Sequence, residues 1–226
     1  MNEDALLDAN HKPSLLAEDV DTSKTGRLKA RSGALLVTVA PLMLRLQKVS
    51  CKYPWGSTFA YLLMSNPNPS NLEGNIELDY IEKTGITDTS EALQISEIFI
   101  FADLEHYDVI PSKGGYARAV VQVGVARTGS TSGNVYLTKV THDLGYVTSS
   151  GDFTSKSTAD ASINFYTNET DYQLCSSQVW LEYNFDIPSG CRLALQVRLY
   201  GYIDTTENGK MKLCCGRGSC DSYLEL

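Results

Sequence analysis

Residues 178–203 read QVWLEYNFDIPSGCRLALQVRLYGYI, and this stretch decides the fold class. Hydrophobic residues occupy alternate positions in both halves, and mostly polar residues stand between them. A period of two is typical of a strand with one buried and one solvated face. The sequence Pro188-Ser189-Gly190 interrupts the pattern with three turn-forming residues. We therefore expect two strands, 178–187 and 192–203, paired as a hairpin.

Residues 115–128 (GYARAVVQVGVART) repeat the same alternation upstream. Alanine and valine fill one face, whereas Arg118 and Gln122 fall on the other. The apolar faces of these three strands should form the core of the protein. The side chains expected to point inward are Val121, Val123, Leu181, Tyr183, Phe185, Leu193, Leu195 and Val197.

The rest of the chain supports an all-β fold. Further strands are expected at residues 35–39, 43–49, 59–64, 76–81, 95–104, 134–141 and 161–167. The single helix candidate is the short segment 90–95. Many short strands without interleaved helices exclude a βαβ sheet and predict an antiparallel β-sandwich that is jelly-roll-like. The Gly-Ser-Thr run at 128–133 lacks the lysine of a phosphate-binding loop, so we interpret it as a hairpin connection.

The first 31 residues differ from the remainder. Their hydrophobic content is confined to short leucine pairs, which is too little for a separate core. We divide the chain into an extended N-terminal arm, 1–31, and a single β-sandwich domain, 32–226. The alternative for the arm is a flexible tail. The arm lacks the basic, then apolar, pattern of a signal peptide, and the apolar stretch 33–46 is too short to span a bilayer.

Charge also limits the function. The chain carries 27 acidic and 19 basic residues, a net charge of −8, and no cluster of lysine and arginine. Nucleic-acid binding is therefore excluded, because phosphate contacts need clustered positive charge. Residues 72–110 hold ten acids and one lysine, whereas residues 32–71 hold three bases and no acid. Such blocks could complement each other between subunits, or they could belong to ordinary solvated surfaces.

No motif indicates catalysis. The histidines His11, His106 and His142 stand at no metal-ligand or triad spacing, and the sequence has no G-x-S-x-G elbow. The pair His142-Asp143 resembles half of an acid–base couple, but a loop histidine explains it better. The acidic run Glu73, Glu77, Asp79 and Glu82 lacks the EF-hand pattern. We therefore expect no enzyme and assign no catalytic, cofactor-binding or metal-ligating residue and no cofactor.

The cysteines leave several states open. Cys214, Cys215 and Cys220 lie within seven residues, a spacing compatible with free thiols, a local disulfide or three of the four ligands of a zinc site. The Asn208-Gly209 pair favours a two-residue turn, so we expect residues 212–214 to pair with the strand that ends at Ile203. Because side chains alternate along a strand, at most one of Cys214 and Cys215 should face the core.

These observations favour two functions of different classes. The first is a non-enzymatic structural protein of a large assembly, in particular a virion component of a capsid, its decoration or a tail, synthesised in host cytoplasm. Its partners would be further copies of the same chain and other structural proteins. The alternative is a carbohydrate- or receptor-binding module, suggested by the thirteen tyrosines, Trp55 and Trp180. Asn168-Glu169-Thr170 matches the glycosylation sequon, which matters only in a secreted chain.

Overall fold

The computed structural model describes the protein over eleven ranges. These are residues 20–21, 27–30, 36–38, 43–51, 61–65, 80–101, 115–129, 132–148, 150–204, 208–215 and 222–226. Side chains are described from residue 80 onward within these ranges, and also at 43–46. All regular elements in this part of the chain are strands, so the predicted all-β class is confirmed. No helix that could cross a membrane occurs among the described residues.

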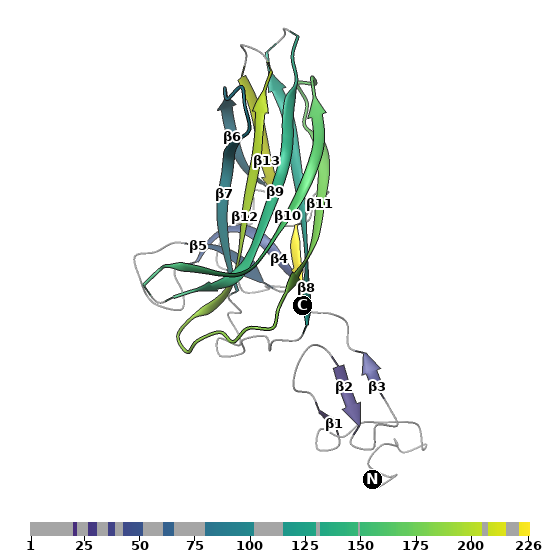
Figure 1. Ribbon diagram of the computed structural model, residues 1–226, viewed down its shortest axis with the longest axis vertical. Helices are drawn as coiled ribbons and strands as arrows, with labels where there is room; N and C mark the ends of the chain where they lie inside the picture. The colour runs from purple at the N-terminus through teal and green to yellow at the C-terminus, as the bar shows by residue number, and fades with distance from the viewer. Residues whose placement is uncertain are drawn as a thin grey trace.

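Two antiparallel layers form the body of the protein (Figure 1). The first layer contains, in spatial order, β7 (Ala92–Phe101), β12 (Arg192–Ile203), β9 (Val135–Val147) and β10 (Phe153–Thr167). The second contains β6 (Tyr80–Ile86), β13 (Asn208–Cys214), β8 (Tyr116–Thr128) and β11 (Gln173–Glu182).

The order of these strands is that of a jelly roll. Counted along the chain from one to eight, the strands of the first layer follow the order 2-7-4-5 and those of the second the order 1-8-3-6. Consecutive strands among these eight therefore lie in different layers, except β9 and β10, which pair with each other in the first layer. Two interlocked Greek keys of eight strands produce this pattern. The predicted jelly-roll-like sandwich is confirmed.

Three further strands link the two layers at one end. β14 (Tyr223–Glu225) pairs with β8 and with β4 (Met43–Cys51). β4 pairs with β5 (Tyr61–Ser65), which runs parallel to β7. The hydrogen-bond ladder is therefore continuous from one layer to the other, although the β5–β7 pairing is the only parallel one among the described strands.

A separate three-stranded antiparallel sheet precedes the body. It consists of β1 (Val20–Asp21), β2 (Arg27–Ala30) and β3 (Leu36–Thr38), and it shares no ladder with the sandwich. The first two strands fall inside the segment expected to be an arm. The other residues of that segment lie outside the described ranges, so the division at residue 31 stays a prediction.

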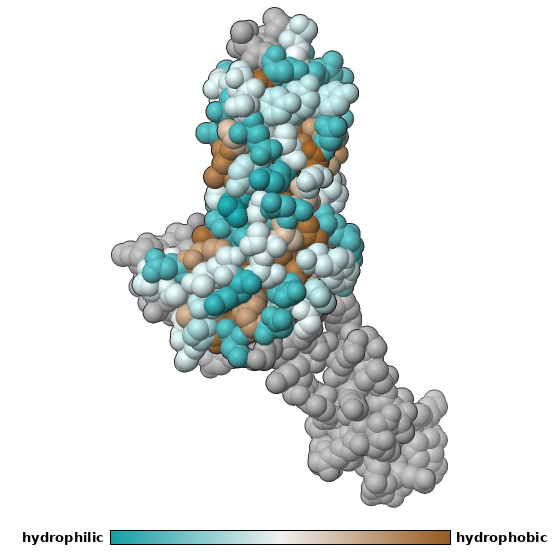
Figure 2. All heavy atoms as spheres, in the orientation of Figure 1, coloured by the Kyte–Doolittle hydropathy of each residue, from teal (hydrophilic) through white to brown (hydrophobic). Residues whose placement is uncertain are grey.

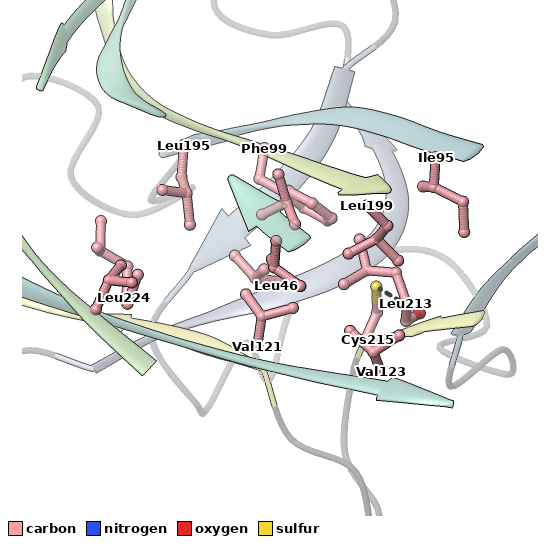
Figure 3. Packing of buried hydrophobic residues seen from close by; sticks show 14 of the residues in the cluster. Leu46, Ile95, Phe99, Val121, Val123, Leu195, Leu199, Leu213, Cys215 and Leu224 are labelled. Atoms are coloured by element: carbon pink, nitrogen blue, oxygen red, sulfur yellow. Dashed lines mark hydrogen bonds between the residues drawn. The ribbon is translucent and has the colours of Figure 1, made fainter. Parts of the chain in front are cut away.

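The core lies between the two layers, where leucine, valine and isoleucine from both sheets interdigitate (Figure 3). Of the eight side chains predicted to point inward, all but Phe185 are buried. Phe185 is half-buried and packs against the cluster, edge-on to Tyr183 with their rings 5.3 Å apart. Burial of this set removes most of the apolar surface of the three regular strands from water, which is the main favourable term in folding.

The predicted strand pairings are wrong in three places. All three predictions paired strands that are consecutive in the sequence, whereas these strands lie in different layers. β11 pairs with β8, β12 pairs with β7 and β9, and β13 pairs with β6 and β8. The chain therefore passes from one layer to the other between β11 and β12, between β8 and β9, and between β12 and β13, so none of these three pairs of strands is a hairpin. The turn at Pro188–Gly190 does form, with the Cys191 amide donating to the Pro188 carbonyl at 3.0 Å, but it lies within a crossing.

The predicted helix at 90–95 is also wrong, because β7 begins at Ala92. A register shift in the β7–β12 ladder at Gln94 breaks the alternation and hides the strand pattern. The Gln94 amide donates to the Gly201 carbonyl at 3.0 Å and to Asp88 at 2.9 Å, which stabilises the irregularity. The remaining predicted strands overlap observed ones, although β9 and β10 are longer than expected and β11 ends at Glu182, five residues before the predicted end at 187. Of the strand expected at 76–81, residues 76–79 lie outside the described residues, and β6 begins at Tyr80.

Candidate recognition site at one end of the sandwich

Four connections gather at the end of the sandwich that is uppermost in Figure 1. Their described residues are 87–91, 129 and 132–134, 168–172, and 204, which follow β6, β8, β10 and β12 in that order. In a jelly roll these four connections belong to one end because the strands alternate in direction. Backbone hydrogen bonds join them: the Ile203 amide donates to Asp88, and the Asp204 amide donates to Asn134.

Asp204 organises this end. Its carboxylate accepts hydrogen bonds from the Asn134 backbone amide at 2.6 Å, the Asn134 side-chain amide at 3.2 Å and the Tyr136 hydroxyl at 2.9 Å. The backbone bond from Asn134 is the largest cause that lowers the pKa of Asp204. The same carboxylate raises the pKa of Tyr136, because it stabilises the protonated phenol. The connection after β8 and the connection after β12 are thereby fixed to each other.

A row of tyrosines lies beside this network on the outer face of the first layer. Tyr166, Tyr136 and Tyr202 are cross-strand neighbours on β10, β9 and β12. The rings of Tyr136 and Tyr202 stack with centroids 4.5 Å apart and planes 7° apart. The Tyr166 ring lies 5.4 Å from Tyr136 and is 57% exposed. One face of this layer therefore presents an aromatic surface supported by neighbouring rings.

A shallow pocket of about 350 Å³ opens at the end of this row. Residues 165–169 form one side, and Asn134 and Gln173 complete it. The backbone of this wall is fixed, because the Arg127 amide donates to Glu169 at 2.8 Å and the Glu169 amide donates to the Thr167 hydroxyl at 3.0 Å. The pocket therefore combines one exposed aromatic ring with amide and carboxylate side chains, a composition suited to a small polar ligand.

The outer face of the second layer presents its own exposed residues. Trp180 is 60% exposed and lies opposite Arg118 in the β8–β11 ladder. Arg118 in turn donates to Gln178 at 2.8 Å and forms an ion pair with Glu225 at 3.2 Å. Leu174 on the same strand is also exposed. Figure 2 shows that hydrophobic patches on the face in view are separate and surrounded by hydrophilic and neutral residues.

Tyr172 covers part of this second face. Its hydroxyl donates to the carboxylate of Glu82, and its ring lies 4.8 Å below the Lys210 ammonium and 4.4 Å from that of Lys212. Burial and the hydrogen bond to Glu82 raise the pKa of Tyr172. Glu82 belongs to the acidic run that the sequence singled out, and its described contacts connect β6 to the segment after β10. The other members of that run, Glu73, Glu77 and Asp79, lie outside the described residues.

His142 is not in a loop, which corrects the sequence-based prediction. It lies on β9, fully buried, and its Nε2 is 3.4 Å from the Ser177 hydroxyl of the opposite layer. Burial lowers the pKa of His142 to about 4, and the nearby carboxylates of Asp143 and Asp160 oppose this shift without cancelling it. The neutral imidazole thus bridges the layers. A serine–histidine contact enclosed in the core offers a substrate no access, so it indicates a structural role.

Asp143 points away from His142, so the pair suggested by the sequence is divided between two faces of the strand. The Asp143 carboxylate accepts a hydrogen bond from the Thr158 hydroxyl at 2.5 Å and forms an ion pair with Arg198 at 2.6 Å. Partial burial acts to lower the pKa of Arg198, but the hydrogen bond and the charge of Asp143, with further negative groups nearby, together raise it. The ion pair joins β9 to β12 on the outer face, and the hydrogen bond from Thr158 joins β10 to β9.

The described cysteines do not form a metal cluster. No group of three or more histidine, cysteine or acidic side chains converges anywhere in the described ranges. Cys214 and Cys215 are both buried, but only Cys215 belongs to the core cluster, where its thiol donates to the Leu213 carbonyl at 3.6 Å. The expectation that at most one of them faces the core is therefore consistent with the structure. Cys51 and Cys220 have no described side chains, so a disulfide or a zinc site that involves them stays a prediction.

Several residues named from the sequence lie outside the described ranges, namely His11, His106 and Trp55. The sequence analysis in turn missed the tyrosine row. The alternation on β12 places Tyr200 and Tyr202 on the polar face, which was a visible signal. Tyr136 and Tyr166 could not be joined to them, because the neighbours of β12 were not known.

Comparisons with known proteins give little guidance. No protein-family model matches the chain, and no curated protein matches it. Two structures of infectious bursal disease virus show a weak likeness at 6% identity. The Gx strain structure aligns with 66% of this chain and 37% of its own at a TM-score of 0.29. The Gt strain structure aligns with 91% and 46% at a TM-score of 0.20, so this chain spans under half of either.

Proposed function

We propose that the protein is a non-enzymatic structural subunit of a large assembly, in particular a viral particle, and that it acts through contacts between subunits. Jelly-roll domains serve both in viral capsids and in lectins, so the fold alone does not select between these functions. The observation that supports the proposal is the position of the exposed apolar side chains on the two layers.

These side chains lie on both outer faces of the sandwich. Tyr166 and Leu93 are exposed on the first layer, and Leu174 and Trp180 are exposed on the second. Leu93 is the cross-strand neighbour of Tyr200 and so extends the aromatic face. A binding module needs one contact surface, whereas a subunit inside an assembly has neighbours on several sides. Large aromatic residues are also the residue type that dominates protein–protein contacts.

The full chain provides the test. Sedimentation velocity and light scattering across a concentration series should show association into species of defined size. Trp180→Ser and Tyr166→Ser, one on each face, should each weaken association about tenfold or more. Ser176→Ala and Ser162→Ala are matched controls on exposed positions of the same strands, β11 and β10, and should leave it unchanged. A chain that stays monomeric at every concentration, including conditions that promote particle assembly, would refute the proposal.

A second function, binding of a carbohydrate or receptor, is favoured by the pocket beside Tyr166. It requires one site and no association between copies. The sedimentation series therefore separates the two functions, since a monomeric chain that binds a glycan would support only the second.

A further inference from the structure

We propose that the pocket at the end of the tyrosine row binds a neutral saccharide, with the Tyr166 ring as the platform for the sugar. This inference rests on the second proposed function and deepens it, because it names the class of ligand and the residues that would hold it. It rests on three properties of the site, which are its exposed ring, its polar side chains and its fixed backbone.

The Tyr166 ring is available and supported. Its exposed fraction of 57% leaves most of one surface open, and Tyr136 lies 5.4 Å away with its plane tilted by 33°. Tyr136 itself is held by the stacked Tyr202 ring and by the hydrogen bond to Asp204. The axial C–H bonds of a pyranose pack on an aromatic face, which removes apolar surface of both partners from water.

The polar side chains around the ring suit sugar hydroxyls. Each hydroxyl both donates and accepts hydrogen bonds, and asparagine and glutamine side chains offer both functions in one plane. Asn168 and Gln173 supply two such amides, and Glu169 supplies a carboxylate. The Asn134 amide group already donates to Asp204 and Tyr136, so its oxygen is the atom that remains to accept a hydrogen bond. Adjacent hydroxyls on a sugar ring match the spacing of the two ends of an amide. A purely apolar ligand would leave these groups without partners, at a cost for each buried polar atom.

The site needs little reorganisation to bind. Asn134 is bonded through its backbone and its side chain to Asp204, and Glu169 is bonded through its backbone to Arg127 and to the Thr167 hydroxyl. The bonds to Asp204 and Arg127 join the walls of the pocket to neighbouring elements, and the bond to Thr167 fixes the wall internally. Since ordering of loops is a major cost of association, a prearranged wall favours binding even for a small contact area.

The charge around the pocket selects the ligand class. Glu169 lines it, Asp204 lies directly behind Asn134, and no lysine or arginine is among the lining residues that the structure describes. An anionic sugar would meet repulsion without a compensating cation. The pocket is open and shallow, so we expect a dissociation constant on the order of 1 mM for a mono- or disaccharide.

The test uses the full chain produced in bacteria, which leaves the Asn168-Glu169-Thr170 sequon without a glycan. Saturation-transfer NMR with methyl glycosides of glucose, galactose, mannose and N-acetylglucosamine, and with lactose, should identify at least one neutral ligand. Sialyllactose, the anionic comparator, should bind about tenfold more weakly than lactose, or not at all, by chemical-shift titration.

Variants of one residue then locate the site. Tyr166→Ala should weaken binding about tenfold, whereas Tyr166→Phe keeps the ring and should stay within about twofold of the parent. Tyr116→Ala is the matched control, because Tyr116 is 63% exposed on β8, away from the pocket. Circular dichroism establishes that each variant is folded.

Three outcomes would overturn the proposal. The first is the absence of saturation transfer from every neutral probe at concentrations about ten times the expected dissociation constant. The second is a folded Tyr166→Ala variant that binds as the parent does. The third is loss of binding in Trp180→Ala with normal binding in Tyr166→Ala, which would place the sugar on the second layer. Sedimentation of the same samples measures association between copies of the chain, so it tests the structural proposal separately from saccharide binding.

Discussion

At the level of single residues, His142 couples the stability of the sandwich to pH. Its pKa falls from an ordinary 6.5 in the unfolded chain to about 4 in the folded protein. The unfolded chain therefore binds more protons than the folded protein between these two pH values. The neutral His142 makes its full contribution to the free energy of unfolding above pH 6.5, and this contribution is lost as the pH falls toward 4. The free energy of unfolding should decrease by up to about 3 kcal/mol over this window.

Chemical denaturation at several pH values, compared with His142→Gln, tests this expectation. Glutamine does not titrate, so the variant should lack the part of the slope that is due to the imidazole. Glu97 acts in the opposite sense, because burial raises its pKa and its ionised form destabilises the protein as the pH rises. Both proteins carry Glu97, so it cancels in the difference. Parallel curves for the two proteins would show that His142 does not titrate in this window.

Leu195 tests the core at the same scale. It is fully buried on β12 and packs among residues of both layers (Figure 3). Leu195→Ala should lower the free energy of unfolding by about 2–5 kcal/mol, because it removes buried methyl groups and leaves a cavity. Leu93→Ala is the matched control, since Leu93 is 49% exposed on β7 and should change stability by less than about 0.5 kcal/mol. Equal losses in urea denaturation would contradict the assigned faces.

Burial was predictable from the sequence where the alternation was regular. Val121, Leu181 and Leu195 follow a strict period of two, and a one-residue slip would move the whole set into water, so the pattern had one solution. His142 was not predictable, because a polar side chain in a strand indicates the solvated face until its partner in the other layer is known. Ser177 is 35 residues away in the sequence and marked by no motif.

Among the elements, the β9–β10 hairpin depends on a glycine at Gly145. A methyl group built there would lie 1.9 Å from the Thr154 carbonyl oxygen, which is backbone and cannot rotate away. Gly145→Ala should therefore separate the two strands locally and cost about 1–3 kcal/mol in the free energy of unfolding. At Gly124 the nearest atoms belong to the Lys212 side chain, which can move. Gly124→Ala is thus the control, and thermal denaturation should show a smaller loss of stability for it than for Gly145→Ala. A larger loss for Gly124→Ala would contradict the close approach of Gly145 to the Thr154 backbone.

Strands were predictable as elements, but their partners were not. Hydrophobic alternation in 178–187 and 192–203 predicts which face of each strand is buried, but it does not indicate which neighbouring strand pairs with each edge. Turn residues such as Pro188 and Gly190 allow a reversal of the chain, yet the same residues serve a crossing between layers. The pairing is decided by how eight strands share one core, which is a property of the whole set. Gln94 adds a local reason, since its irregularity removes the strand signal from 90–95.

For the whole molecule, the arm can be tested by its removal. The sandwich completes its ladder from β4 to β14 without β1, β2 or β3. Deletion of residues 1–31 should therefore leave the free energy of unfolding within about 0.5 kcal/mol of the full chain. Assembly should decrease, because the short leucine pairs of this segment are expected to contact other subunits. Sedimentation of the shortened chain provides the measurement, and unchanged assembly would contradict the role of the arm.

The position of β13 between β6 and β8 has a consequence for how the protein is made. Among the strands that the structure describes, β6 pairs only with β13, and more than a hundred residues separate the two strands. At a synthesis rate of about 5–20 residues per second, β6 emerges from the ribosome roughly 6–25 s before its partner exists. During that interval its edge is open to other nascent chains, so chaperones and a low rate of initiation should raise the yield of native protein.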